Sequence, residues 1–175
     1  SDDGTKLIVT NEDDNLIRVL NTSNLQIEKT YSFDMIRPKS IIANKNFDTI
    51  YASSRLGNTI YKIANSTFKK ISINGLPINE SPSTTAPNPW SLQMSPNNRE
   101  YFVAWSQTNE LRVMDANTDA LKKVLPIGVK PQEMTVSKKL PYLFVTCMDD
   151  PASGLKSKGS VYVINYNTLE IVKRI

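Results

Sequence analysis

The sequence has no histidine, and among its 175 residues there is a single cysteine, Cys147. Without histidine, the chain lacks the most frequent general base, the commonest metal ligand and any histidine that could ligate haem. One cysteine cannot form an intrachain disulfide, so a small disulfide-stapled secreted domain is excluded. A lone cysteine is compatible with a cytosolic protein or with an exported bacterial protein.

The sequence also lacks a long apolar run and lacks familiar catalytic patterns. A membrane helix needs about 18 or more consecutive apolar residues, and no segment approaches that length. GxSxG, HExxH, CxxC, P-loop and GxGxxG patterns are absent. The net charge is +4, but the basic residues are scattered in small groups rather than clustered on one segment. This pattern disfavours nucleic-acid binding.

What the chain does contain is a pattern repeated four times, at a spacing of about 42 residues. The copies lie in residues 7–21, 49–65, 101–115 and 143–165. We predict blade repeats at approximately 1–42, 43–94, 95–136 and 137–175. Repeats of this length are units that cannot bury their own faces and must stack on one another.

Each repeat contains short strands rich in Ile, Val, Tyr, Phe and Thr, separated by turn residues at intervals of roughly 8–12 residues. No sustained 3.6-residue apolar period is present, so we expect essentially no helix. The predicted fold is an all-β propeller of four-stranded blades. A β-sandwich with chance similarity between strands is the alternative. Six valines at repeated positions should be buried between neighbouring blades: Val9, Val19, Val103, Val113, Val145 and Val163.

The repeats resemble the YVTN family of β-propellers. The family pattern SPDGxxLYVTNxxxNxVxVIDxxTxxVxxxIxVGxxPxGxAV is similar to residues 6–30 and 95–136, and it returns in 142–175. Residues 48–73 form a more divergent copy. The resemblance implies a seven-bladed ring and an exported protein of the surface-layer-like or periplasmic kind. Related propellers include lactonase-like enzymes and the haem d1 domain of nitrite reductases.

One departure from the family pattern concerns the start of the innermost strand, where the family often has Pro-His-Gly. The corresponding residues are Pro38-Lys39-Ser40, Pro89-Trp90-Ser91 and Pro131-Gln132-Glu133. The missing histidine puts haem ligation and histidine-based catalysis in doubt for this stretch.

Counting strands gives three strands followed by three sets of four, fifteen in total. A seven-bladed ring of four-stranded blades needs about 28. We therefore expect a single, partial propeller domain over residues 1–175, an excised or mature product with about four blades. A closed ring of four blades with one incomplete blade is the alternative.

Two insertions interrupt the repeat, at residues 74–88 and 149–159. Strand direction predicts that both emerge on one face, together with the turn at 11–15. Insertions confined to one face often mark the binding side of a repeat protein. We predict that a partner docks there through Trp90, Asp149, Asp150 and Lys156, with Trp90 as the aromatic anchor. Unselected surface loops are the alternative.

An acidic cluster at Glu12, Asp13 and Asp14 could bind Ca²⁺, which takes six to eight oxygen ligands. The cluster lacks the alternating DxDxDG order of a calcium loop, so a solvated turn between two strands is the favoured interpretation. We predict no other cofactor and no catalytic residue.

The combined prediction is a non-catalytic binding or scaffold module, exported in a bacterium to the periplasm or cell surface. Its expected partner is another protein or the remaining blades of a larger propeller, with no nucleic acid and no membrane span. The alternative is the propeller portion of a periplasmic redox or haem-containing enzyme whose cofactor residues lie outside this chain. Lactonase-like hydrolysis would need a cluster of acids and bases that the sequence does not show.

Overall fold

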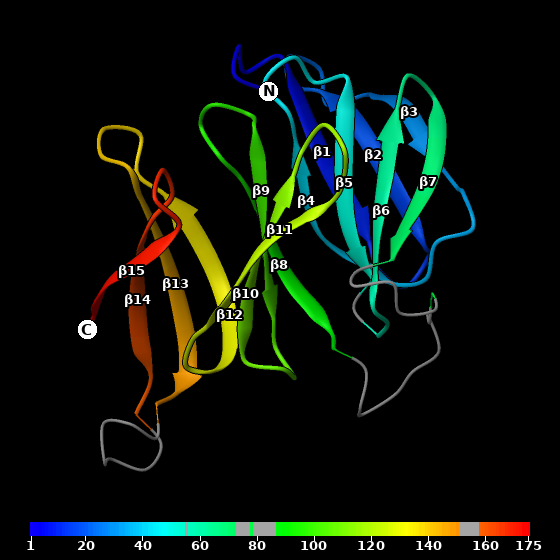
Figure 1. The fold of residues 1–175 in the computed structure, drawn as a ribbon. Helices are drawn as coiled ribbons and strands as arrows, with labels where there is room; N and C mark the ends of the chain where they lie inside the picture. Colours follow the sequence, from blue (N-terminus) through cyan, green and yellow to red (C-terminus); the bar gives the residue numbers. More distant parts are fainter. Residues whose placement is uncertain (55, 73–77, 79–86, 151–157) are drawn as a thin grey trace. The chain divides into compact units, whose positions relative to one another are not determined.

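The computed structural model describes residues 1–54, 56–72, 78, 87–150 and 158–175, and these residues form β-strands, turns and no helix (Figure 1). Fifteen strands are present in this described part, the number expected from the sequence. Their bounds are β1 Lys6–Asn11, β2 Leu16–Asn21, β3 Ile27–Tyr31, β4 Pro38–Ala43, β5 Thr49–Ser54, β6 Thr59–Ala64, β7 Thr67–Ser72, β8 Pro89–Met94, β9 Glu100–Trp105, β10 Glu110–Asp115, β11 Leu121–Pro126, β12 Val129–Val136, β13 Tyr142–Asp149, β14 Ser160–Asn165 and β15 Glu170–Arg174.

The chain divides into two compact units, residues 1–86 and 87–175. The first unit holds the three-stranded sheet β1-β2-β3 and the four-stranded sheet β4-β5-β6-β7. The second unit holds two four-stranded sheets, β8-β9-β10-β11 and β12-β13-β14-β15. Every pairing is antiparallel between strands that follow one another in the chain. We call β4, β8 and β12 the inner strands, because each is the first strand of a four-stranded sheet.

Local sequence explains the turn between the second and third strands of three sheets. Each turn begins with Asn or Asp, and the side chain accepts a backbone N–H two residues on, at 2.9 Å in each case. The turn closes with a hydrogen bond from the fifth residue to the first, at a residue with positive φ. The three turns start at Asn21, Asp115 and Asn165. Short polar side chains therefore fix the register of the strands that follow.

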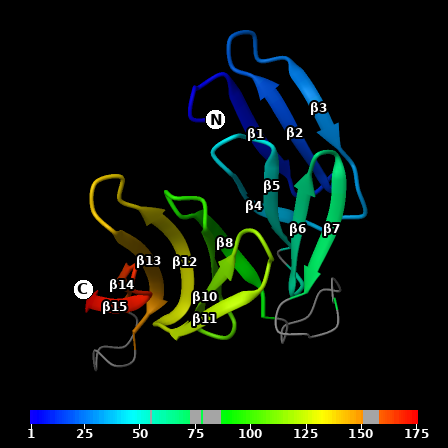
Figure 2. The ribbon, with the colours of Figure 1, turned by 45° about the horizontal axis from the view of Figure 1, so that its top comes forward.

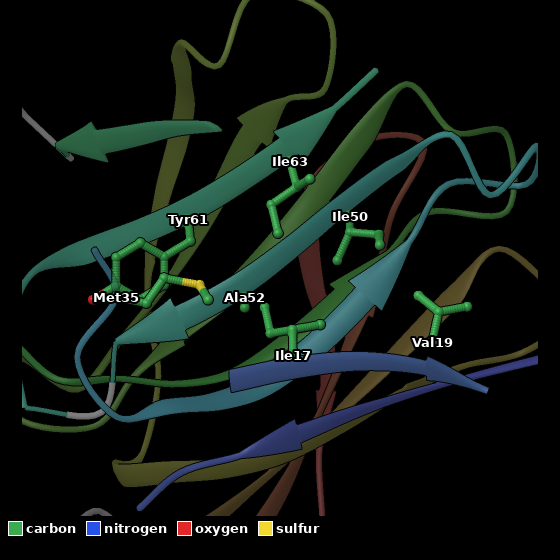
Figure 3. Close-up of a cluster of buried hydrophobic side chains, with 7 residues drawn as sticks. All are labelled: Ile17, Val19, Met35, Ile50, Ala52, Tyr61 and Ile63. Atoms are coloured by element: carbon green, nitrogen blue, oxygen red, sulfur yellow. The ribbon is translucent and has the colours of Figure 1, made fainter. Parts of the chain in front are cut away.

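Each unit has its own apolar core between its two sheets. In the first unit Ile17 and Val19 of β2 lie against Ile50 and Ala52 of β5 (Figure 3). In the second unit, the corresponding cluster gathers side chains from five strands: Phe102, Leu111, Val113, Leu125, Leu143, Val145 and Ile164. A blade covers one face of the next in both units.

Five of the six valines expected in the interior are buried: Val19, Val103, Val113, Val145 and Val163. The prediction for Val9 is wrong, because 41% of this residue is exposed. Side chains alternate between the faces of a strand. Ile8 packs against the core of the first unit, so Val9 points to the opposite face, which no sheet formed by the described residues of that unit covers.

Candidate functional site

A proline near the start of each inner strand is followed by a β-bulge. Regular pairing breaks after Pro38 in β4, after Pro89 in β8 and after Pro131 in β12. A bulge leaves residues out of the ladder and redirects their side chains. The two residues that follow each of these prolines stand where the YVTN pattern often has His-Gly, and they therefore project from irregular backbone. The side chains at these positions are therefore candidates for a functional site.

In the second unit the two bulges lie close together. The hydroxyl of Ser91 in β8 donates to Oε2 of Glu133 in β12 at 3.4 Å. Ser91 is buried, while Glu133 is exposed and the neighbouring Trp90 is half-buried. The Gln132 amide group donates to the backbone oxygen of Lys130 at 3.2 Å. This end of the second unit thus combines an aromatic ring, an amide and a carboxylate. We call Trp90, Ser91, Gln132 and Glu133 the bulge cluster.

The predicted residues of the second insertion behave differently from one another. Asp149 ends β13 and is half-buried, and it pairs with Val129 at the start of β12, the same end of the sheet as the bulge. Asp150 is buried and its carboxylate lies 3.3 Å from Nε of Arg174. The charge of Asp150 is therefore paired with Arg174 within the second unit. Lys156 lies outside the described residues, as does most of the first insertion.

A buried thiol lies beside this end of the second unit. Burial raises the pKa of Cys147 to about 11, although the neighbouring Gly128 N–H and Ser160 hydroxyl act to lower it. A Cβ added at Gly128 would lie 2.8 Å from the Cys147 Cβ, so only glycine allows this close approach. A thiol with a raised pKa and little exposure is a poor nucleophile and a poor metal ligand.

In the first unit, an arginine and an amide contact the acidic turn predicted as a weak calcium site. Nε of Arg37 lies 3.2 Å from Glu12, and its terminal nitrogen lies 3.1 Å from Asp13. The Asn11 amide donates to Asp14 at 2.7 Å. Within the described residues, no group of three acidic, histidine or cysteine side chains is placed to hold a metal ion. The Arg37 guanidinium supplies the positive charge that a cation would bring.

One buried charged group had no signal in the sequence. Arg112 of β10 is buried, and its guanidinium lies 4.5 Å from the ring centroid of Trp105 in β9. Its terminal nitrogen also lies 2.9 Å from Glu110. The aromatic face and the carboxylate together compensate the desolvation of this cation. The sequence pattern indicates only an alternating strand. The contact between Arg112 and Trp105 depends on the pairing of β10 with β9, in which Arg112 lies opposite Val103.

Comparison with known proteins shows the fold. No family model matches the chain, and no curated protein sequence matches it. A solved structure of hydrazine synthase from Kuenenia stuttgartiensis matches 99% of this chain at 15% identity and a TM-score of 0.81. The match covers 46% of that protein's chain, so the present chain spans about half its length. At this identity the likeness concerns the fold alone.

The protein is all-β, built from successive antiparallel sheets of the propeller type, as the sequence predicted. More particularly, the part of the chain that the structure describes forms four blade-like sheets, the first with three strands and the others with four. Membership of the YVTN family stays a prediction. In the described part of the chain, no helix has the length and apolarity needed to cross a bilayer.

Proposed function

We propose that this protein is a non-catalytic binding or scaffold module, whose partner docks on the bulge cluster of the second unit. The observation that supports this function most directly is the pairing of Ser91 with Glu133 at 3.4 Å. It brings two bulged strands together and aligns their exposed residues. Rigid strands then hold the side chains that a partner would contact.

The chemistry of the cluster suits recognition of a polypeptide. Aromatic side chains are enriched at the centre of protein interfaces, where they supply much of the binding energy. Trp90 has the partial exposure of such an anchor, and Glu133 beside it adds an exposed negative charge. A partner with an apolar residue next to a lysine or arginine would complement this pair. Asp149 lies at the same end of its sheet and extends the acidic character.

Paired variants of the second unit test this function. Trp90→Ala and Glu133→Lys should each abolish recovery of the partner when the tagged protein is isolated from its own cells. Lys138→Ala is the matched control, because Lys138 is exposed at the opposite end of sheet β12–β15. The recovered protein is then purified and titrated against the same variants. Equal binding by all of them would exclude the bulge cluster as the docking site.

Shortening the two insertions separates loop contacts from strand contacts. Residues 74–88 and 149–159 would each be replaced by a turn of about two to four residues, as in the other repeats. Loss of partner binding in either deletion supports the predicted binding face. Binding that survives both deletions but not Trp90→Ala would restrict the site to the strands.

The proposed location is the periplasm or cell surface of a bacterium, which the repeat resemblance supports. Fractionation of cells that express the complete open reading frame tests it. The second candidate is the propeller portion of a redox or haem-containing enzyme, and the similarity in fold to a solved hydrazine synthase favours it. Its cofactor residues would lie outside this chain. A haem absorption band in the product of the complete reading frame would support that candidate.

A further inference from the structure

Each sheet has a lysine at the same position of its last strand, which is β3, β7, β11 or β15. The pairing register places each lysine opposite the residue of the preceding strand that stands at the repeat position of Val19. The four lysines are Lys29, Lys69, Lys123 and Lys173. In the sequence these residues belong to scattered basic groups, and only the strand pairing shows that they are equivalent. We call them the aligned lysines.

In the second sheet the aligned lysine lies opposite another lysine. Lys69 pairs with Lys62 of β6, and like charges directly opposite each other disfavour strand pairing. The Lys62 ammonium group lies 5.2 Å from the ring centroid of Tyr51, which offsets part of this repulsion. Cross-strand stability therefore does not explain a lysine at this position, and a contact outside the sheet does.

The basic residues next to the aligned lysines of the second unit form ion pairs. Nζ of Lys122 lies 2.7 Å from Oε1 of Glu100, and Nε of Arg174 lies 3.3 Å from Oδ2 of Asp150. The two aligned lysines of this unit form no ion pair with another described residue. Their positive charges are therefore available to an anionic partner.

The last strands of the second unit lie on the side away from the bulge cluster. The inner strands β8 and β12 lie side by side, and Ser91 contacts Glu133 between them. The strands β11 and β15 stand at the other ends of the two sheets, and Figure 2 shows β15 (red) at the far end of its sheet from β12 (yellow). We call the surface formed by β11 and β15 the outer side of the second unit.

Exposed aliphatic side chains accompany the aligned lysines on the outer side. They lie within two residues of Lys123 or Lys173 in the sequence: Leu121, Val124, Ile171 and Val172. Cations mixed with aliphatic groups match a surface that presents anions above an apolar layer, as an anionic lipid bilayer does. A soluble polyanion would pair with the charges but would leave the aliphatic side chains in water.

We propose that the outer side of the second unit is a contact surface for an anionic lipid membrane. Lys123 and Lys173 bind lipid phosphate groups, and the aliphatic side chains beside them enter the boundary between headgroups and acyl chains. The contact is peripheral and reversible, because two lysines and a few aliphatic groups supply a modest free energy. The bulge cluster stays accessible on the opposite side, so this inference goes beyond the proposed function and does not depend on it.

Sedimentation of the 175-residue chain with lipid vesicles tests the outer side. Vesicles of equal parts phosphatidylglycerol and phosphatidylcholine should bind the chain, and vesicles of phosphatidylcholine alone should not. Lys123→Gln and Lys173→Gln should each weaken binding by about fivefold, and the double variant by about twentyfold. Lys123→Arg and Lys173→Arg keep the positive charge and should bind as the unchanged chain does.

Two further variants separate this contact from a general effect of charge. Lys138→Gln is the matched control, because it removes the same charge from an exposed residue outside β11 and β15, and it should leave binding nearly unchanged. Val172→Thr keeps the charge and the branched shape but removes an exposed methyl group, and it should weaken binding by about threefold. Far-ultraviolet circular dichroism checks that every variant keeps the β-sheet signal of the unchanged chain.

Four results would overturn the proposal. The first is a chain that does not bind the anionic vesicles. The second is equal weakening by Lys138→Gln and Lys123→Gln, since net charge alone would then explain the binding. The third is unchanged binding by Val172→Thr together with equally strong binding to dextran sulfate, which would assign the surface to a soluble polyanion. The fourth is aggregation of Lys123→Gln with unchanged vesicle binding, because the lysines would then only protect the strand edges from pairing.

Discussion

Truncating a valine at one repeat position should have different consequences in the first and fourth sheets. Val145 in β13 is fully buried in the core of the second unit, whereas 41% of Val9 in β1 is exposed. Val145→Ala removes two methyl groups, about 1.6 kcal/mol of transfer free energy, and leaves a cavity. The expected loss in the free energy of unfolding is about 2–3 kcal/mol. Val9→Ala should lose about 0.5–1 kcal/mol, because part of the side chain already contacts water.

Urea denaturation measures the two costs separately. Both tryptophans, Trp90 and Trp105, lie in the second unit, so their fluorescence reports the unfolding of that unit. With a denaturant slope of about 2 kcal/mol/M, Val145→Ala should lower the fluorescence midpoint by about 1 M. Val9→Ala is followed by far-ultraviolet circular dichroism and should shift its transition by less than half as much.

An equal loss in the free energy of unfolding for the two substitutions would contradict this prediction. Equal large losses would mean that Val9 is covered in solution, and equal small losses would mean that the core of the second unit is not packed around Val145.

The remaining predictions concern the second unit. Burial raises the Cys147 pKa from 9.0 to about 11. The neutral thiol therefore contributes to stability below about pH 9, and this contribution is lost as the pH rises toward 11. Cys147→Ala should remove that part of the pH dependence of the free energy of unfolding. Gly128→Ala should destabilise by about 1–3 kcal/mol, because the new Cβ would lie 2.8 Å from the Cys147 Cβ, and a second change, Cys147→Gly, should recover part of the loss. Asp150→Asn breaks the ion pair with Arg174 and should lower the free energy of unfolding by about 1 kcal/mol, whereas Arg174→Lys should lower it by less. An unchanged thermal midpoint for Asp150→Asn would show that this ion pair does not contribute to stability.

Sequence reasoning found the repeat because each strand and turn is specified locally. Alternating Ile, Val and Tyr residues define a strand without reference to distant residues, and Asn or Asp closes the turns at residues 21, 115 and 165 through its own backbone contacts. The fifteen strands and the absence of helix in the described residues follow from such local signals.

The candidate site was only partly predictable. The position of Trp90 after a proline was visible in the sequence, but its proximity to Glu133 depends on two bulges from different sheets. Asp150 was predicted to contact a partner, whereas the structure buries it against Arg174, a residue 24 positions away. Long-range ion pairs have no periodic signature, because they depend on which loops fold back onto which strands.

The sequence by itself determined the repeat, the strand order and the apolar positions, since these depend on neighbours within a few residues. Tertiary structure alone decided which face of each sheet is covered. Val9 and Val145 occupy the same repeat position in similar strands, yet among the described residues only Val145 has the other sheet of its own unit packed against it. A strand's pattern states that one face prefers burial. Whether another sheet is present to bury it depends on elements far along the chain.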